Sequence, residues 1–231
     1  QIYEKTTSPV FFVSLNTGEY IKYLSNTLLA TLISFSNEMS VIADQFGDID
    51  VASAFRILHL DKRWNGCNMA SYVYPGCGYG GYCLPKDTNA LYSLTKSAGF
   101  DAQILMNVIA TNDGIPHVIS NKIVKELNGN LEMKLGILGL SFKPYSDDVR
   151  DAPSAKIISC LLQAGCNNIY AYDPVANEEF KKHYDMPVKY YTDYKQILEE
   201  ADVLVIATAW PEFREIRSLT DKRGIDCRYM L

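Results

Sequence analysis

The sequence is poor in the features that mark several protein classes. Its 231 residues include only three His and six Cys, and no two Cys are spaced as Cys-x-x-Cys. A zinc site is therefore not expected, and we assign no metal ligands. No apolar run reaches the roughly 18 residues that suggest a membrane span, and nothing resembles a secretion signal. We therefore expect a cytoplasmic protein in a reducing compartment.

The charge of the chain also argues against several partners. Lys plus Arg number 22 and Asp plus Glu 27, which gives a net charge of −5 without any basic run. Such a chain is not expected to bind nucleic acid or an anionic membrane, so a phosphate-bearing ligand would need a few well-placed cations. Apolar residues make up 48% and charged residues 21%, as in ordinary soluble globular proteins. The length predicts one or two domains.

The first half of the sequence has the periodicity of helices. Residues 19–46 contain neither Gly nor Pro, and their apolar residues recur every three or four positions. This pattern predicts one long amphipathic helix of about 40 Å. Lys22 and Asn26 would project from one face of it because they are four residues apart. Further helices are expected at 51–60, 88–98 and 104–127.

From residue 133 onward, short apolar runs alternate with helical patterns. This alternation predicts a parallel sheet covered on both faces, with ligands bound beyond the carboxyl ends of the strands. We therefore divide the chain into a lead-in segment (1–18), an all-helical domain (19–106) and an α/β domain (107–231). The strands are expected at 134–140, 168–172, 188–191, 202–207 and 225–231, and the helices at 153–164, 178–184, 193–200 and 211–217.

A glycine-rich stretch between the two halves matches a known pattern in the wrong context. Gly76, Gly78 and Gly81 fit G-x-G-x-x-G, but no apolar strand precedes them and Pro75 lies immediately before. A dinucleotide fingerprint requires a strand before it and a helix after it. We therefore expect a loop in which glycines let backbone N–H groups approach a ligand closely.

Two cations follow the first predicted strand. Lys143 and Arg150 come shortly after residues 134–140. At the carboxyl end of a first strand they would suit an anionic ligand. The alternative is that they are solvated loop charges.

Cys83 is the thiol whose surroundings suggest reactivity. It precedes a predicted helix, and Lys86 is three residues on. A helix N-terminus and a nearby cation each favour the thiolate, which is the nucleophilic form. Asp87 could orient Lys86 or hold a water, or it could simply place a charge at the start of the helix. A Cys–His hydrolase that uses His59 or His117 stays open as a competing reading.

Four blocks of sequence, in this order, resemble the nucleotide-sugar dehydrogenases of the UDP-glucose/GDP-mannose dehydrogenase family. The resemblance runs from about residue 19 to the end. It implies an all-helical central dimerisation domain with a long helix, followed by a Rossmann-like parallel α/β domain. The blocks are residues 19–38, 75–87 (PGCGYGGYCLPKD), 139–150 with 172–174, and 207–213 with 226–228.

The resemblance implies a four-electron oxidation of a sugar C6 alcohol to a carboxylate with two NAD molecules. Cys83 matches the family nucleophile, which forms a thiohemiacetal and then a thioester. Lys22 and Asn26 match residues that stabilise the developing oxyanion, and a cation and an amide one turn apart can reach one oxygen. Asp87 matches the Asp that assists the Lys and the water.

The resemblance also assigns binding residues, and it implies a homodimer formed through the long helix. On the UDP-sugar side it assigns Lys22, Asn26, Arg63, Tyr72, Tyr74, Pro75, Gly76, Cys77, Gly78, Tyr79, Gly80, Phe142, Lys143 and Arg228. On the NAD side it assigns Cys83, Leu84, Pro85, Lys86 and Arg150.

The family's N-terminal NAD domain has no counterpart in this sequence. No strand–GxGxxG–helix precedes the long helix, and the chain starts at Gln1. We therefore expect a fragment whose residues 1–18 lead in from that domain, which binds UDP-sugar weakly and does not turn over. The motif GYGGYCLPKD favours UDP-glucose as substrate. The alternatives are a UDP-N-acetylhexosamine or GDP-mannose 6-dehydrogenase, or a non-catalytic nucleotide-sugar-binding module.

Overall fold

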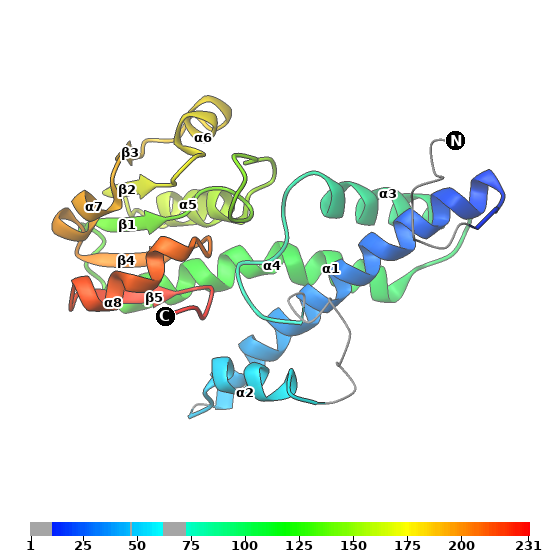
Figure 1. The fold of residues 1–231 in the computed structure, drawn as a ribbon, viewed down its shortest axis with the longest axis horizontal. Helices are drawn as coiled ribbons and strands as arrows, with labels where there is room; N and C mark the ends of the chain where they lie inside the picture. The colour runs from blue at the N-terminus through cyan, green and yellow to red at the C-terminus, as the bar shows by residue number, and fades with distance from the viewer. Residues whose placement is uncertain (1–10, 47, 62–72) are drawn as a thin grey trace.

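The structure is a computed structural model that describes residues 11–46, 48–61 and 73–231 (Figure 1). A helical part is followed by a parallel α/β part, which confirms the predicted fold class. The helical part consists of α1 (Leu15–Phe46), α2 (Val51–Leu58), α3 (Cys83–Ser97) and α4 (Gln103–Glu126). No helix among the described residues is long and apolar enough to cross a membrane.

The long helix α1 begins four residues earlier than its periodicity predicts. Ser14 explains the difference, because its hydroxyl accepts a hydrogen bond from the Thr17 backbone N–H at 3.2 Å. A serine in this position caps the first turn of a helix. Gly18 then lies inside the first turn, where it does not end the helix.

Helix α4 joins the two parts of the molecule (Figure 1). It packs against α1 and α3 at one end and against α5 at the other. Ala30 of α1, Tyr79 and Val108 of α4 form one small buried cluster in the helical part. Further along α4, Ile119 and Ile123 belong to the core of the α/β part. One continuous helix therefore fixes the position of the helical part relative to the sheet.

The α/β part is built on a five-stranded parallel sheet with strand order β3-β2-β1-β4-β5. Both central strands, β1 and β4, are buried along their whole length. Such continuous apolar strands are typical of a parallel sheet with helices on both faces. The strands are β1 (Leu135–Leu138), β2 (Ile169–Tyr172), β3 (Lys189–Tyr190), β4 (Val203–Ile206) and β5 (Arg223–Asp226), and the helices are α5 (Pro153–Gln163), α6 (Asn177–His183), α7 (Tyr194–Glu200), the 3₁₀ helix η3 (Pro211–Glu215) and α8 (Ile216–Leu219).

Two separate cores cover the two faces of the sheet. On one face, Ile137 and Val205 pack with residues of α4, α5 and α6, including Phe180. On the other, Leu138 and Leu204 pack with residues of α7, η3 and α8. Because the strands are parallel, the carboxyl ends of β1, β4 and β5 lie at the same end of the sheet.

The prediction of a last strand over 225–231 is wrong. Strand β5 covers Arg223–Asp226, and the chain then turns. The Asp226 carboxylate accepts hydrogen bonds from the backbone N–H groups of Arg228, Met230 and Leu231. A side chain therefore takes the donors that a longer strand would have used.

The predicted start of the third helix is also wrong. Helix α3 begins at Cys83, five residues before the predicted start at residue 88. Pro85 allows this early start, because proline is tolerated in the first turn of a helix, where its missing N–H has no intrahelical partner.

We predict that Asp173→Ala lowers the free energy of unfolding by about 3 kcal/mol or more, because buried donors lose their only charged acceptor. Asp173 follows β2 and is buried. Its carboxylate accepts from the N–H groups of Leu140, Ser141, Val175 and Ala176 and from the Trp210 indole. Urea unfolding followed by circular dichroism measures the change.

The matched control for this variant is Asp193→Ala. Asp193 caps α7 through a single hydrogen bond from the Lys195 N–H. An exposed cap of this kind contributes about 1 kcal/mol. If the two variants lost equal stability, the network around Asp173 would not stabilise the sheet as described.

Candidate active site

The glycine loop, residues 73–82, is fixed by two buried asparagines from the long helices. Asn37 of α1 accepts a hydrogen bond from the Gly76 N–H at 2.7 Å. Asn112 of α4 accepts from the Tyr79 N–H at 2.7 Å and donates to the Tyr79 carbonyl at 3.1 Å. Gly78 has φ of +90°, and a Cβ there would lie 2.6 Å from the Asn112 side-chain oxygen. The loop therefore has its backbone set by α1 and α4.

Arg228 reaches this loop from the end of β5. A Cβ at Gly76 would lie 2.4 Å from the Arg228 Nη1, so only glycine permits the approach. The Arg228 Nε is buried and has no hydrogen-bond partner in the structure. A buried, unpartnered guanidinium nitrogen beside a cavity is suited to an anionic ligand.

Cys83 is the first residue of α3 and is exposed. Tyr82, in the N-cap position, supplies no side-chain hydrogen bond to the helix. The ring of Tyr82 instead lies beneath the Arg150 guanidinium, 4.8 Å from ring centre to Cζ. Asp148 holds Arg150 in place through two hydrogen bonds, at 2.9 and 2.7 Å. The first turn of α3 thus remains uncapped beside an arginine of fixed orientation.

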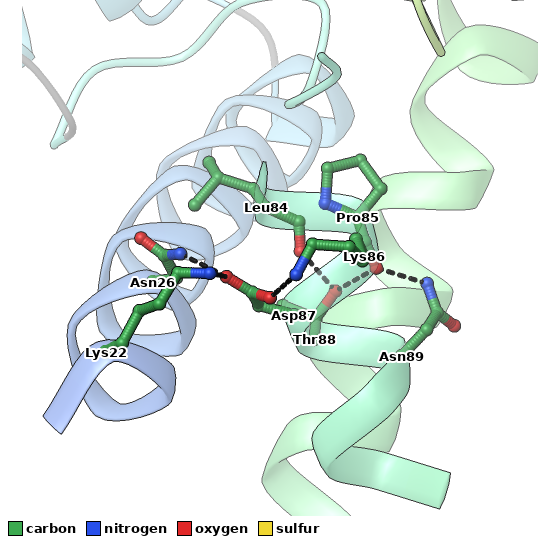
Figure 2. A network of polar contacts seen from close by, with 8 residues as sticks. All are labelled: Lys22, Asn26, Leu84, Pro85, Lys86, Asp87, Thr88 and Asn89. Atoms are coloured by element: carbon green, nitrogen blue, oxygen red, sulfur yellow. Dashed lines mark hydrogen bonds and ion pairs between the residues drawn. The ribbon is translucent and has the colours of Figure 1, made fainter. Parts of the chain in front are cut away.

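Asp87, one turn after Cys83, is the centre of a polar cluster between α1 and α3 (Figure 2). Its side chain is fully buried. It accepts hydrogen bonds from the Asn26 amide at 2.5 Å and from the Lys86 ammonium, and the Lys22 ammonium lies 3.4 Å away. Figure 2 shows Lys22 and Asn26 on one helix pointing to Asp87 on the neighbouring one. The sequence-predicted Lys–Asn pair is therefore held against a carboxylate.

Opposing effects act on the charge of Asp87. Burial by itself raises the pKa of this carboxyl, but the hydrogen bonds from Lys86 and Asn26 and the charge of Lys22 outweigh burial. The pKa of Asp87 therefore lies below its ordinary value. The hydrogen bond to Asp87 in turn raises the pKa of Lys86. The contact between Lys86 and Asp87 therefore favours the charged form of both side chains.

A cavity of about 560 Å³ adjoins the Asp87 cluster and is lined by part of the glycine loop. It lies between α1, the glycine loop, the start of α3 and the ends of the strands. Cys83 and Asn26 both line it, as do the cations Lys143, Arg150 and Arg228. The remaining lining residues are Leu29, Ile33, Tyr74, Gly76, Gly78, Tyr79, Gly80, Tyr82, Leu84, Phe142, Ser146 and Asp148.

The structure separates the predicted site residues into two groups. Twelve residues named from the sequence line the cavity, among them Lys143 and Arg150, the two cations that follow β1. Six other predicted residues that the structure describes do not line the cavity. Three of them form the adjoining polar cluster: Lys22, Lys86 and Asp87. The other three belong neither to the cavity lining nor to that cluster: Pro75, Cys77 and Pro85. Arg63 and Tyr72 lie outside the described residues.

Cys77 was predicted to bind the UDP-sugar, but its side chain does not line the cavity. It is 1% exposed, and its thiol donates to the Ala207 carbonyl at 3.5 Å. This contact attaches the glycine loop to the end of β4. The side chain of Cys77 therefore serves packing between loop and sheet.

Five lining residues were missed by sequence reasoning, and two of them had a usable signal. Leu29 and Ile33 follow Asn26 by three and seven residues. That is the spacing of one helix face, so they could have been placed beside Asn26. Tyr82, Ser146 and Asp148 sit in loops, where periodicity gives no guidance.

The cavity suits an anionic ligand with a nucleotide's dimensions. Three cations face it from segments that follow β1 and β5, at the edge where open α/β sheets bind ligands. A cavity of this size is typical of small-molecule sites. No group of three or more His, Cys, Asp or Glu in the described part of the chain could hold a metal ion. The fold and the cavity are those of an α/β protein in which a thiol and three cations line one small-molecule-sized cavity.

Comparison with known families and relatives agrees with this description. The central-domain model of the UDP-glucose/GDP-mannose dehydrogenase family matches residues 16–114, and the UDP-binding-domain model of the same family matches residues 136–231. UDP-glucose 6-dehydrogenase TuaD of Bacillus subtilis is 36% identical over 216 residues, which cover 94% of this chain and 46% of the relative. The chain belongs to the UDP-glucose/GDP-mannose dehydrogenase family.

Solved structures support the same assignment. A UDP-glucose dehydrogenase of Pyrobaculum islandicum superposes with a TM-score of 0.90 at 32% identity, over 99% of this chain and 51% of the other. A UDP-D-ManNAc dehydrogenase of Pyrococcus horikoshii gives 0.78 at 25% identity, over 98% and 51%. The chain therefore spans about half the length of the relatives it matches.

We predict that Asp87→Asn makes the chain less stable at pH 7 and that the difference from wild type shrinks as pH falls. A carboxyl with a depressed folded pKa stabilises the fold above its unfolded pKa of about 4, and this contribution is lost as pH falls through the folded value. The thermal midpoint measured from pH 7 to pH 3 gives the difference. Asp185→Asn, at an exposed position, is the control. A difference for Asp87→Asn that did not vary with pH would contradict the coupling.

Proposed function

We propose that this chain forms the C-terminal part of an NAD-dependent UDP-glucose 6-dehydrogenase. The observation that carries the proposal is the position of Cys83: an exposed thiol at an uncapped helix start, facing the same cavity as Asn26 and three cations. The names of the Bacillus subtilis and Pyrobaculum islandicum relatives support UDP-glucose as the substrate.

In this proposal the UDP-sugar occupies the cavity with its diphosphate toward Lys143 and Arg228. Both cations line the cavity, and the Arg228 Nε has no hydrogen-bond partner among the residues that the structure describes. The glycine loop supplies a closely approaching backbone, held from behind by Asn37 and Asn112. The sugar C6 then lies toward Cys83, which lines the same cavity.

Cys83 is the proposed nucleophile. Once the C6 alcohol has been oxidised to an aldehyde, the Cys83 sulfur adds to the carbonyl carbon and gives a thiohemiacetal. Loss of a hydride from C6 and of the hydroxyl proton gives a thioester, and water releases the carboxylate and the thiol. NAD, when bound, accepts one hydride in each of the two oxidations.

Lys22, Asn26 and Asp87 are proposed to stabilise the oxygen that carries the developing charge. An ammonium has three donors and an amide two, so each can bind Asp87 and a substrate oxygen at once. Asp87 holds both donors in position. Donors that are placed before the reaction stabilise the oxyanion without reorganisation.

The N-terminus of α3, which has no side-chain cap, is suited to bind a phosphate group of the cofactor. The backbone N–H groups of Cys83 and Leu84 receive no side-chain cap from Tyr82, and Arg150 lies against the same turn. Helix N-termini bind phosphate groups through such N–H groups. We propose that Cys83 to Lys86 and Arg150 form the part of the NAD site that this chain supplies.

The direct test compares this chain with the protein that also carries an N-terminal NAD domain. We expect the chain to bind UDP-glucose in a calorimetric titration but to reduce no NAD, and the longer protein to form UDP-glucuronate. In the longer protein Cys83→Ala should abolish acid formation, because it removes the thiol that lines the cavity. Cys160→Ala, a half-buried thiol outside the cavity, is the control and should stay active.

The same experiment separates the alternatives. A panel of UDP-glucose, a UDP-N-acetylhexosamine and GDP-mannose should yield product from UDP-glucose alone. Product from another sugar would reassign the substrate while leaving the chemistry intact. Acid formation that survives in Cys83→Ala would overturn the nucleophile. No turnover by the longer protein with any sugar would favour a nucleotide-sugar-binding module.

We also propose that two copies of the chain assemble through α1. Ile21, Leu24, Leu28 and Phe35 are each about half exposed. Their spacing puts them on one stripe of the helix, since 3.6 residues make a turn. A continuous apolar stripe on the surface is typical of a protein interface.

We expect Leu28→Glu to convert the dimer into a monomer, because a charge would be buried at the centre of the stripe. Light scattering coupled to size exclusion measures the mass. Leu219→Glu, at an equally exposed leucine on α8, should leave the dimer intact. A monomeric wild-type chain at every concentration tested would disprove the interface.

A further inference from the structure

A second cysteine, Cys160, is paired with a histidine away from the proposed active site. Its Sγ on α5 lies 3.4 Å from the His117 Nδ1 on α4. The hypothesis of a Cys–His hydrolase requires His59 or His117 as the partner of Cys83. The structure instead places the His59 Nε2 2.7 Å from the Val73 carbonyl and pairs His117 with Cys160. The proposed dehydrogenase chemistry uses neither member of this pair.

The pair opens into its own cavity of about 460 Å³, between α4, α5 and the segment that follows α6. Cys160 is half-buried, whereas Cys166 at the end of α5 is buried. Its thiol is therefore both reachable and next to a base. The lining includes Asp113, His117, Lys156, Cys160, Gln163 and Tyr184.

The position of the pair within two helices restricts its chemistry. Attack on a carbonyl group requires backbone or side-chain donors for the oxyanion. Cys160 and His117 both lie in helix interiors, where backbone N–H groups are used by the helix itself. The described residues also contain no group of three or more His, Cys, Asp or Glu that could hold a metal ion. Exchange with a disulfide needs neither an oxyanion hole nor a metal.

We propose that Cys160 is a nucleophilic thiol that forms a mixed disulfide with small disulfides carrying an ammonium group. The Cys160 sulfur bonds to one sulfur of the disulfide while the original S–S bond breaks. His117 Nδ1 takes the thiol proton and passes it to the departing sulfur, which leaves as a free thiol. The incoming disulfide is the oxidant, so no other redox partner is needed.

The charges on the cavity wall define the ligand class. Lys156 is paired with Asp151 at 2.8 Å, so these two charges cancel. Asp113, one turn before His117 on α4, leaves the wall with an excess negative charge. The Tyr184 hydroxyl donates to the Val149 carbonyl at 2.8 Å and so has its proton engaged. A cationic group on the ligand is therefore favoured over a carboxylate.

The test measures exchange with cystamine at each cysteine of the chain by peptide mass spectrometry. We expect an adduct at Cys160 and none at the buried Cys166. His117→Gln should slow the Cys160 reaction by about tenfold or more, since it removes the base, and leave the rate at Cys83 unchanged. Absence of an adduct at Cys160, or an equal rate in His117→Gln, overturns the proposal. Continued protection of the buried Cys166 in His117→Gln shows that the variant is folded.

A second comparison tests the ligand class. Dithiodiglycolate, which carries carboxylates in place of ammonium groups, should react at Cys160 about threefold more slowly than cystamine, and Asp113→Asn should remove the difference. Equal rates with both disulfides in the wild type would overturn the assigned class. UDP-glucose should protect Cys83 and not Cys160. Loss of protection at Cys83 would count against the proposed function and leave the Cys160 result standing.

Discussion

The Asp87 carboxylate is the constraint on which the site depends. A buried carboxylate is costly unless donors and cations surround it, and here Asn26 and Lys22 reach it from α1 while Lys86 reaches it from its own helix. These contacts hold α1 and α3 together at Asp87. That arrangement fixes the start of α3, and with it Cys83, relative to α1.

The position of the glycine loop is also set by buried polar side chains. Asn37 and Asn112 bind its backbone from the two long helices, and Arg228 fills the space that a side chain at Gly76 would need. Since α4 also packs into the core beneath the sheet, the loop is tied to the cations that follow the strands. A thiol from the helical part and cations from the α/β part thus face one cavity, and the Gly81 N–H, which donates to the Arg150 carbonyl, joins their segments directly.

Periodicity predicted most helices and the first four strands within a few residues, because those patterns follow from burial. Periodicity failed where the hydrogen bonds of one side chain set the end of an element. Asp226 ends β5 early by accepting backbone hydrogen bonds. Ser14 caps α1 and so lets the helix begin early. The motifs predicted most of the residues that line the first cavity. The spacing of Leu29 and Ile33 from Asn26 on one helix face could have predicted these two as well. The Cys160–His117 pair could not, since the residues are 43 apart and only the packing of α4 on α5 joins them.

The two thiol cavities share one wall, residues 148–153. Arg150 lines the first cavity and Asp151 the second. This wall is held from both sides: the Gly81 N–H donates to the Arg150 carbonyl at 2.9 Å, and the Tyr184 hydroxyl donates to the Val149 carbonyl at 2.8 Å. A ligand in either cavity can influence the other only by moving a segment that both sides hold. Coupling therefore requires a differential strain on these bonds, and without it the two thiols react independently.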